Sequence, residues 1–241
     1  MALSYFRYHM TKVRGDIAAD FKWLVQLLCT TQVEAIPRIL IFFHNLNKLS
    51  DAFEYTRARA NLQVGEKNPI IAMFHKLTNS ECKDAVINSL AENIGRLRVV
   101  FCSSSLSMGM NLKNIQYVIH YGPPVTAEAF VQETGRAARE KSLHGHSILM
   151  TYPRMFAGRK PDDTMKAYVK QQQCLRNILL AKFSSAKPED QLECCDFCEA
   201  YLDCPILSLI RGNDDSSATE SMSDSDSSVA SAGALDDLPD L

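Results

Sequence analysis

Long apolar stretches are missing from this sequence. No run reaches the roughly 18 to 20 residues that cross a bilayer, which argues against an integral membrane protein. A secretion leader is missing as well, because residues 1–10 lack an apolar core followed by a small-residue cleavage site. We therefore expect an intracellular protein in a reducing compartment, where the eight cysteines stay as thiols or bind metal instead of forming disulfides.

Basic side chains are missing from the end of the chain, since no lysine or arginine follows Arg211. Residues 1–211 hold all 26 basic side chains and 20 of the 28 acids, a net charge of +6. That balance permits a polyanionic partner without requiring one. The Ser/Asp-rich tail has few large apolar groups to offset its ordering entropy, so we expect residues 206–241 to be disordered.

The rest of the chain alternates between apolar runs and helical patterns. Strands are expected at 38–43, 70–74, 97–102, 116–121 and 147–152. Helices are expected at 12–30, 47–60, 78–93, 126–139 and 161–183. Strands without polar alternation, separated by helices, predict an α/β fold with a parallel sheet covered on both faces. Ligands in such folds bind at the carboxyl ends of the strands.

One candidate site is the segment QETGRAAR at 132–139. On a helix, Gln132, Arg136 and Arg139 are spaced i, i+4 and i+7, so that one amide and two guanidinium groups share a face. Arginine offers a planar fork that suits phosphate oxygens, and two such forks could stabilise charge on a transferring phosphoryl group. The alternative is a solvated charged face, which is the commoner case for helical arginine pairs.

A polar loop follows the strand at 97–102. It contains three consecutive serines at 103–105 and then Gly109. Small residues allow a backbone to approach a ligand closely, and hydroxyl and N–H groups can bind phosphate. An ordinary polar loop is the alternative.

Five of the eight cysteines lie close together near the end of the chain: Cys174, Cys194, Cys195, Cys198 and Cys204. The pair Cys195-x-x-Cys198 has the spacing of half a tetrahedral zinc site. In a reducing compartment zinc is favoured over disulfides, with unliganded thiols as the alternative. A structural zinc would stabilise the fold and perform no catalysis.

In this order, the segments resemble the second RecA-like lobe and zinc subdomain of RecQ-family 3′–5′ DNA helicases, over about residues 3–204. QETGRAAR resembles the family's motif VI, usually QETGRAGR, and FCSSSLSMGMN at 101–111 is similar to motif V. MFHKLT at 73–78 resembles the YHAGL element, and ILIFFHN at 39–45 the strand of motif IV.

The cysteine region extends the resemblance. The segment that begins at Cys174 resembles the family's CRRxxLLxxF helix, and CCDFC at 194–198 its CDxC element. These imply a structural Zn²⁺ on Cys174, Cys195 and Cys198. The fourth ligand is either Cys194 or Cys204, because the family's second zinc cysteine falls at Leu192. A generic DEAD-box lobe matches less well, since it lacks this module.

The resemblance also implies roles for the other candidates. Arg139 would be the arginine finger facing ATP and Mg²⁺ on a first lobe, and Arg136 and Gln132 would couple the nucleotide to lobe movement. The residues implied to contact single-stranded DNA independently of sequence are His75, Ser103 and Ser105. The residues implied in nucleotide coupling are Gly109 and Asn111.

The sequence also departs from the family. Ala138 stands where motif VI has its second glycine, and Ser107 replaces a motif V glycine. There is no G-x-x-x-x-G-K-[ST] phosphate loop, no acidic DExH box and no winged-helix module. Since ATP hydrolysis needs groups from both sides of the interlobe cleft, this polypeptide alone should neither hydrolyse ATP nor unwind DNA.

We thus expect a RecA-like lobe over 1–155, a small helical zinc-binding subdomain over 156–205 and a disordered acidic tail over 206–241. The resemblance implies the C-terminal half of a nuclear, ATP-dependent 3′–5′ DNA helicase of repair or recombination. Its partners would be DNA and a first helicase lobe or another protein, with no membrane. The alternative is a non-catalytic DNA- or protein-binding fragment regulated by its acidic tail.

Overall fold

The structure is a computed structural model, and it describes residues 6–63, 65, 69–92, 95–107, 112–136, 145–183, 194–199 and 203–212. Within this part of the chain, no helix is both long and apolar enough to span a bilayer.

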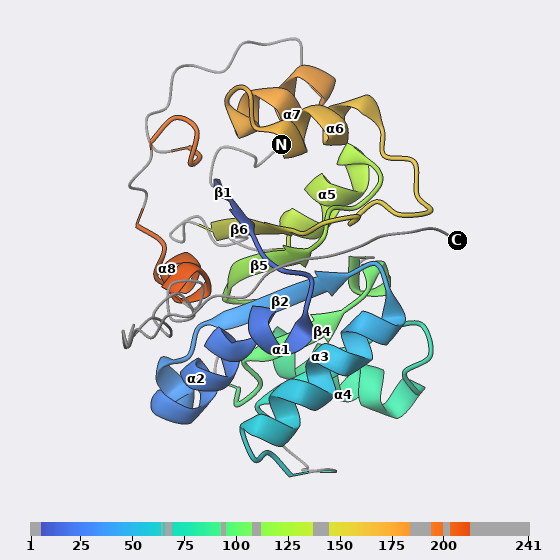
Figure 1. Ribbon diagram of the computed structural model, residues 1–241. Coiled ribbons are helices and arrows are strands. Elements are labelled where there is room, and N and C mark those ends of the chain that lie inside the picture. Colours follow the sequence, from blue (N-terminus) through green and yellow to red (C-terminus); the bar gives the residue numbers. More distant parts are fainter. Residues whose placement is uncertain are drawn as a thin grey trace, which may run out of the picture.

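A parallel sheet of six strands, in the order β1-β6-β5-β2-β4-β3, forms the centre of the molecule (Figure 1). The strands are β1 (Phe6–Lys12), β2 (Arg38–Phe43), β3 (Ile71–Phe74), β4 (Val99–Cys102), β5 (Ile115–Tyr121) and β6 (Gly145–Thr151). Every residue of β2 and β4 is buried, as expected of strands covered on both faces. The α/β fold with a RecA-like parallel sheet is therefore confirmed.

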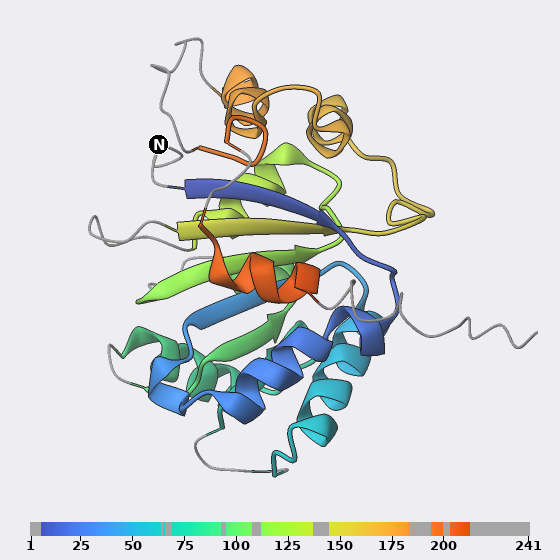
Figure 2. The ribbon, with the colours of Figure 1, turned by 60° about the vertical axis from the view of Figure 1, so that its left-hand side comes forward.

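Helices cover both faces of the sheet. The α-helices are α1 (Ile17–Asp20), α2 (Lys22–Thr30), α3 (Leu46–Arg59), α4 (Ser80–Ala91), α5 (Ala127–Thr134), α6 (Asp163–Lys170), α7 (Leu175–Phe183) and α8 (Pro205–Gly212). Short 3₁₀ turns lie at Val33–Ala35 and Ser104–Ser107. We call the face under α4, α5, α6 and α7 face A, and the face under α2, α3 and α8 face B. In Figure 2, α8 lies across the sheet on face B.

Side-chain caps fix where several helices begin. Asn45 precedes α3 and accepts hydrogen bonds from the N–H groups of Asn47 and Lys48. Thr126 precedes α5 and accepts from the N–H of Ala129, as the expected start of that helix requires. Such caps satisfy N–H groups that have no partner inside the helix. The cap of α3 lies two residues after the end of β2, and the cap of α5 lies five residues after the end of β5.

The N-terminal strand β1 was not expected. The predicted helix at 12–30 is shorter and broken, because β1 runs to Lys12 and the helical part begins only at Ile17. Along β1, Phe6, Tyr8 and Met10 point into the core of face A. This alternation is typical of a strand. The backbone of β1 pairs in parallel with that of β6.

The C-terminal part also differs from expectation. The predicted helix at 161–183 is two helices, because Gln171 adopts a left-handed conformation with φ of 50° and ends α6. The disordered tail expected from residue 206 is wrong for residues 206–212, which belong to α8. Ile206, Leu207 and Ile210 of this helix are buried on face B and stabilise it. Residues 213–241 lie outside the described part of the chain.

Candidate functional site

The carboxyl ends of β3 and β4 bring the candidate DNA contacts together. His75 directly follows β3 and Ser103 directly follows β4, and these strands are neighbours. The N–H of Ser103 donates to the carbonyl of Phe74 at 3.0 Å, so the two loops leave the sheet side by side. The hydroxyls of Ser103 and Ser105 lie 2.9 Å apart. One half-buried imidazole and two hydroxyls therefore share this edge of the sheet.

The loop after β3 orients the His75 ring. Its backbone N–H donates to the hydroxyl of Thr78 at 3.0 Å, and its Nδ1 accepts from the N–H of Leu77 at 3.2 Å. Partial burial, together with the charge of Lys83, lowers the pKa of His75. A neutral ring that accepts at Nδ1 carries its proton on Nε2. His75 can therefore donate one hydrogen bond to a phosphate or sugar oxygen.

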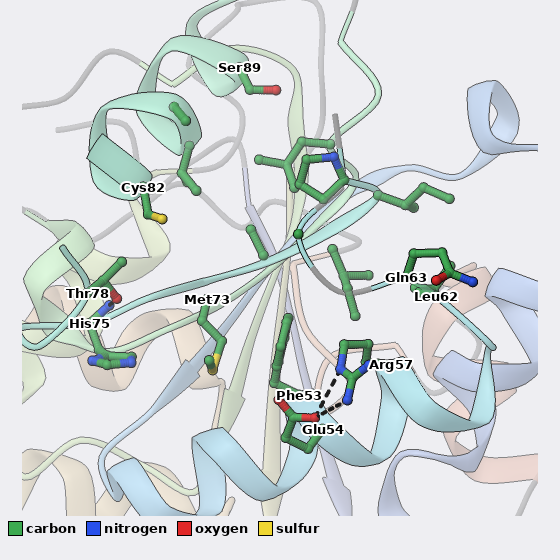
Figure 3. Close-up of a pocket in the computed structure, with 18 of the residues that line it drawn as sticks. Phe53, Glu54, Arg57, Leu62, Gln63, Met73, His75, Thr78, Cys82 and Ser89 are labelled. Carbon is green, nitrogen blue, oxygen red and sulfur yellow. Dashed lines mark hydrogen bonds and ion pairs between the residues drawn. The ribbon is translucent and has the colours of Figure 1, made fainter. Parts of the chain in front are cut away.

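An apolar groove of about 500 Å³ lies beside these residues, between α3 and α4 and over the edge strand β3 (Figure 3). His75 and Thr78 lie at one end of it, and Phe53 and Met73 line its middle. An exposed ion pair between Glu54 and Arg57, with 2.6 Å between oxygen and nitrogen, lies at its rim. The groove is lined mainly by apolar side chains, whereas the loops that follow β3 and β4 present polar ones.

The QETGRAAR segment does not form one helical face. Helix α5 ends at Thr134, so the i, i+4 spacing predicted between Gln132 and Arg136 is interrupted. Gln132 is exposed, whereas Arg136 turns inward and is only 7% exposed. The N–H of Gly135 still donates to the carbonyl of Val131 at 2.9 Å, and the chain continues as a turn at 135–136. Three candidates lie outside the described residues: Gly109, Asn111 and Arg139.

The same segment contains a buried acid–base pair that sequence reasoning missed. Glu133 on α5 and His120 on β5 are both buried, and Oε2 of Glu133 lies 3.0 Å from Nε2 of His120. Next along, the hydroxyls of Thr134 and Ser147 lie 3.2 Å apart. These polar contacts attach the inner side of α5 to β5 and β6. A histidine inside the apolar strand QYVIHY was the available signal.

His44 is a second residue that was missed, and it follows β2 at the same carboxyl edge. Burial lowers its pKa to about 4, against the opposing effect of the Glu133 charge. The ring is therefore neutral at physiological pH. His44 belongs to the segment ILIFFHN, but nothing in the spacing of that segment indicated a functional histidine.

Four thiols converge on face A beside β1. Their Sγ–Sγ distances are 3.4 Å for Cys174–Cys194, 3.5 Å for Cys194–Cys198, 3.7 Å for Cys195–Cys198, 3.8 Å for Cys194–Cys195 and 3.9 Å for Cys195–Cys174. Tetrahedral zinc with bonds of about 2.3 Å separates its sulfurs by about 3.8 Å. The donor set and the spacing both fit such an ion. We call these four residues the thiol cluster.

The backbone presents these thiols. Cys174 directly precedes α7, while the turn at 194–198 lies along the outer edge of β1. Tyr8 donates to the carbonyl of Cys194 at 3.0 Å, and the N–H of Asp196 donates to the carbonyl of Tyr8 at 3.1 Å. A hydrogen bond from the Cys174 thiol is the main cause that lowers the pKa of Cys195. One sulfur of the cluster is thus favoured as a thiolate, the form that binds metal.

Cys204 is not in this cluster. Of the two alternatives for a fourth ligand, the structure brings Cys194 to the other three thiols and places Cys204 on face B, near His9 and His146. Cys194 lies at a bend just before the turn at 196–198, and its sulfur lies 3.8 Å from that of the adjacent Cys195.

Comparison with known proteins places this architecture. The family model described as the helicase conserved C-terminal domain matches residues 19–141. The ATP-dependent DNA helicase RecQ of Haemophilus influenzae is 28% identical over 210 residues, which span 80% of this chain and 32% of that protein. The ATP-dependent RNA helicase dbp7 of Botryotinia fuckeliana is 29% identical over 107 residues, which span 43% of this chain and 12% of that protein.

Among solved structures, domain 2 of the DEAD-box helicase Mss116p, bound to an RNA duplex, aligns with a TM-score of 0.52 at 14% identity. The alignment covers 76% of this chain and 65% of that one, and it shows a shared fold. The chain spans about a third or less of the length of the curated relatives that it matches. With half of the sequence matched by the family model and a RecA-like parallel sheet, the chain belongs to the helicase conserved C-terminal domain family and forms a second helicase lobe.

Proposed function

We propose that this lobe works in a RecQ-type, ATP-dependent 3′–5′ DNA helicase, opposite a first lobe that holds ATP and Mg²⁺. The thiol cluster is the observation that carries the choice of family. Four sulfurs, all within 4.8 Å of one another, follow the lobe in sequence and lie beside its first strand. The similarity to a bacterial RecQ over 80% of the chain supports the same choice.

In this proposal the carboxyl edge of the sheet is the DNA track. The ring of His75 and the hydroxyls of Ser103 and Ser105 contact the phosphate backbone of single-stranded DNA. Hydrogen bonds to backbone oxygens carry no sequence information, so binding is independent of sequence. The net charge of +6 over residues 1–211 supports attraction to a polyanion.

The nucleotide side of the proposal rests on the motif VI segment. Arg139 reaches the triphosphate on the first lobe and stabilises the charge that develops during phosphoryl transfer. Gln132, Arg136, Gly109 and Asn111 transmit the nucleotide state to the track. The buried contact between Glu133 and His120 supports this, because it fixes the inner side of α5 to the sheet.

The thiol cluster would hold one structural Zn²⁺ through Cys174, Cys194, Cys195 and Cys198. The ion would neutralise thiolates and cross-link α7 to the turn along β1. It supplies no catalytic chemistry, since four protein ligands leave no open position. A nuclear location and a role in repair or recombination remain predictions from the RecQ resemblance.

A chimera tests the proposal. The first lobe of the Haemophilus influenzae RecQ would be joined to the N-terminus of this chain. We expect ATP hydrolysis stimulated by single-stranded DNA, and unwinding of duplexes with a 3′ tail. Arg139→Lys should lower kcat by about a thousandfold, the scale of an arginine finger, with DNA affinity unchanged. Arg59→Lys is the matched control, because Arg59 is exposed at the end of α3 and should leave kcat unchanged.

Other outcomes decide against parts of the proposal. Full turnover in Arg139→Lys would remove the finger role. Stimulation by RNA but not by DNA would place the chain with RNA helicases, as its similarity to dbp7 allows. A folded chimera that binds DNA or protein but never hydrolyses ATP would favour the non-catalytic alternative.

A further inference from the structure

A second group of metal-binding side chains lies on face B, apart from the thiol cluster. It contains His9 on β1, His146 on β6 and Cys204, which directly precedes α8. One ring nitrogen of each histidine and the sulfur of Cys204 all lie within 4.8 Å of one another. Nε2 of His9 and Nδ1 of His146 are 3.0 Å apart. His9 and Cys204 are buried, and His146 is half-buried.

Strand alternation separates this group from the thiol cluster. Consecutive residues of a strand point to opposite faces. Tyr8 therefore points into face A, and His9 into face B, where its ring stacks on His146 with centroids 5.3 Å apart. In the turn along β1, the sulfur of Cys195 lies on face A and the carboxylate of Asp196 contacts His9. One peptide unit thus joins the two groups.

Asp196 orients the His9 ring. Its Oδ1 lies 2.7 Å from Nδ1 of His9, and its Oδ2 accepts from the N–H of Met10 at 3.1 Å and from Arg211 at 3.2 Å. Since an ionised carboxylate only accepts hydrogen bonds, the proton of a neutral His9 ring is on Nδ1. The lone pair of Nε2 then faces His146 and Cys204. A carboxylate behind a histidine is the usual support for a metal-bound imidazole.

We propose that His9, His146 and Cys204 form a second Zn²⁺ site, with Asp196 as its supporting carboxylate. Two imidazoles and one thiolate are ligands that zinc prefers, and a fourth position remains for water. The thiolate and the Asp196 carboxylate would offset the charge of the dication, and Arg211 would pair with the outer oxygen of that carboxylate. The hydrogen bond between the histidine rings is the arrangement that the metal replaces, and the rings need to separate by only a few tenths of an ångström.

The site would attach α8 to the sheet. Its ligands come from the two strands at one edge of the sheet and from the residue before α8, which packs on face B (Figure 2). Arg211 at the other end of α8 already donates to the carbonyl of Met10 at 3.0 Å. With zinc bound, both ends of the helix are held against β1. This attachment of α8 is independent of the proposed helicase activity.

Counting metal ions tests the inference. The full 241-residue chain would be purified with zinc and freed of loose metal by dialysis, and its zinc content measured by elemental mass spectrometry. We expect about two zinc ions per chain. His146→Gln and Cys204→Ala should each leave about one, and Cys198→Ser should remove the other. His75→Gln, which changes a half-buried histidine outside both groups, should retain two.

The outcomes separate this site from the thiol cluster. One zinc per chain that Cys198→Ser removes would overturn the second site and leave the thiol cluster intact. Two zinc ions retained in His146→Gln would also overturn it. Should Cys204→Ala fail to fold, the half-buried His146→Gln decides. Substitution with Co²⁺ gives an independent measurement, because thiolate-to-cobalt absorption reports each metal-bound sulfur. His146→Gln should remove the absorption that is due to Cys204 and leave the absorption that is due to the four sulfurs of the thiol cluster.

Discussion

The two edges of the sheet are protected in different ways. At the β1 edge, the turn at 194–196 pairs with Tyr8, and Arg176 of α7 donates to the carbonyl of Phe6 at 3.0 Å. The thiol cluster lies there on face A, and the group of His9, His146 and Cys204 lies on face B. At the β3 edge, no described segment pairs with the outer side of the strand. There, α3 and α4 flank an apolar groove (Figure 3).

The difference shows how each edge is stabilised. The side chains of β3 are mostly buried between α3 and α4, two helices that are consecutive in the sequence, and a groove lies over the strand. The β1 edge is formed by segments about 190 residues apart in sequence, which polar contacts and thiols hold together. An unprotected edge strand invites pairing with other chains, so a covered edge has a clear benefit. Three substitutions test whether the two edges depend on these separate causes.

The largest effect is expected at the β1 edge. Under the proposed function Cys198 holds a structural zinc ion, so Cys198→Ser should lower the free energy of unfolding by about 4 kcal/mol or more. The amides of Tyr8 and Asp196, which hydrogen-bond across this edge, should also exchange with solvent faster. Thermal unfolding and amide hydrogen exchange measure the two effects.

The control for this substitution is Cys82→Ser. Cys82 is exposed on α4, so its free energy of unfolding should change by less than about 0.5 kcal/mol. If Cys198→Ser unfolds at the same temperature as Cys82→Ser, the thiol cluster does not hold the β1 edge.

A smaller loss is expected at the β3 edge. Phe74 is 4% exposed and packs with Val86 and Leu90 of α4. Phe74→Ala should lower the free energy of unfolding by about 3 to 5 kcal/mol, because it leaves a cavity in the core of face A. Zinc content should not change, since β3 and β1 lie at opposite edges of the six-stranded sheet. Denaturant unfolding checks the first effect and elemental analysis the second.

Leu77→Ala is the matched control, because Leu77 is 74% exposed in the next loop. Its free energy of unfolding should stay within about 0.5 kcal/mol of the parent. An equal loss in both variants would contradict the view that burial stabilises this edge.

The smallest effect lies between the edges, at His44. Burial lowers the pKa of His44 from 6.5 to about 4. Between these pH values the histidine is protonated in the unfolded chain and neutral in the folded chain. The free energy of unfolding should therefore fall as the pH drops from 6.5 towards 4, by on the order of 2 kcal/mol. His44→Gln removes this contribution and should flatten the pH dependence of denaturant unfolding. The same slope in parent and variant would mean that His44 does not titrate in this way.

Local patterns predicted the central part of the fold. RILIFF and the later apolar runs are strands because such segments need burial on both faces, and their helices follow from caps and periodicity. The same patterns failed at β1, at the end of α5 and at α8. β1 alternates apolar and polar residues over only seven positions. Helix α8 is stabilised by the burial of three apolar side chains on face B, which the local sequence does not reveal.

The sequence by itself determined the parallel α/β lobe, the helicase motifs and the C-x-x-C spacing, because each depends on residues close together in the chain. Tertiary structure decided which cysteines share a cluster. Cys194 and Cys204 are equally plausible partners for Cys195 in sequence, yet the pairing of the turn with Tyr8 sends one to face A and leaves the other on face B. The physical reason is that a backbone hydrogen bond to Tyr8 holds Cys194 at the outer edge of β1, whereas Cys204 directly precedes α8, whose apolar side chains are buried on face B.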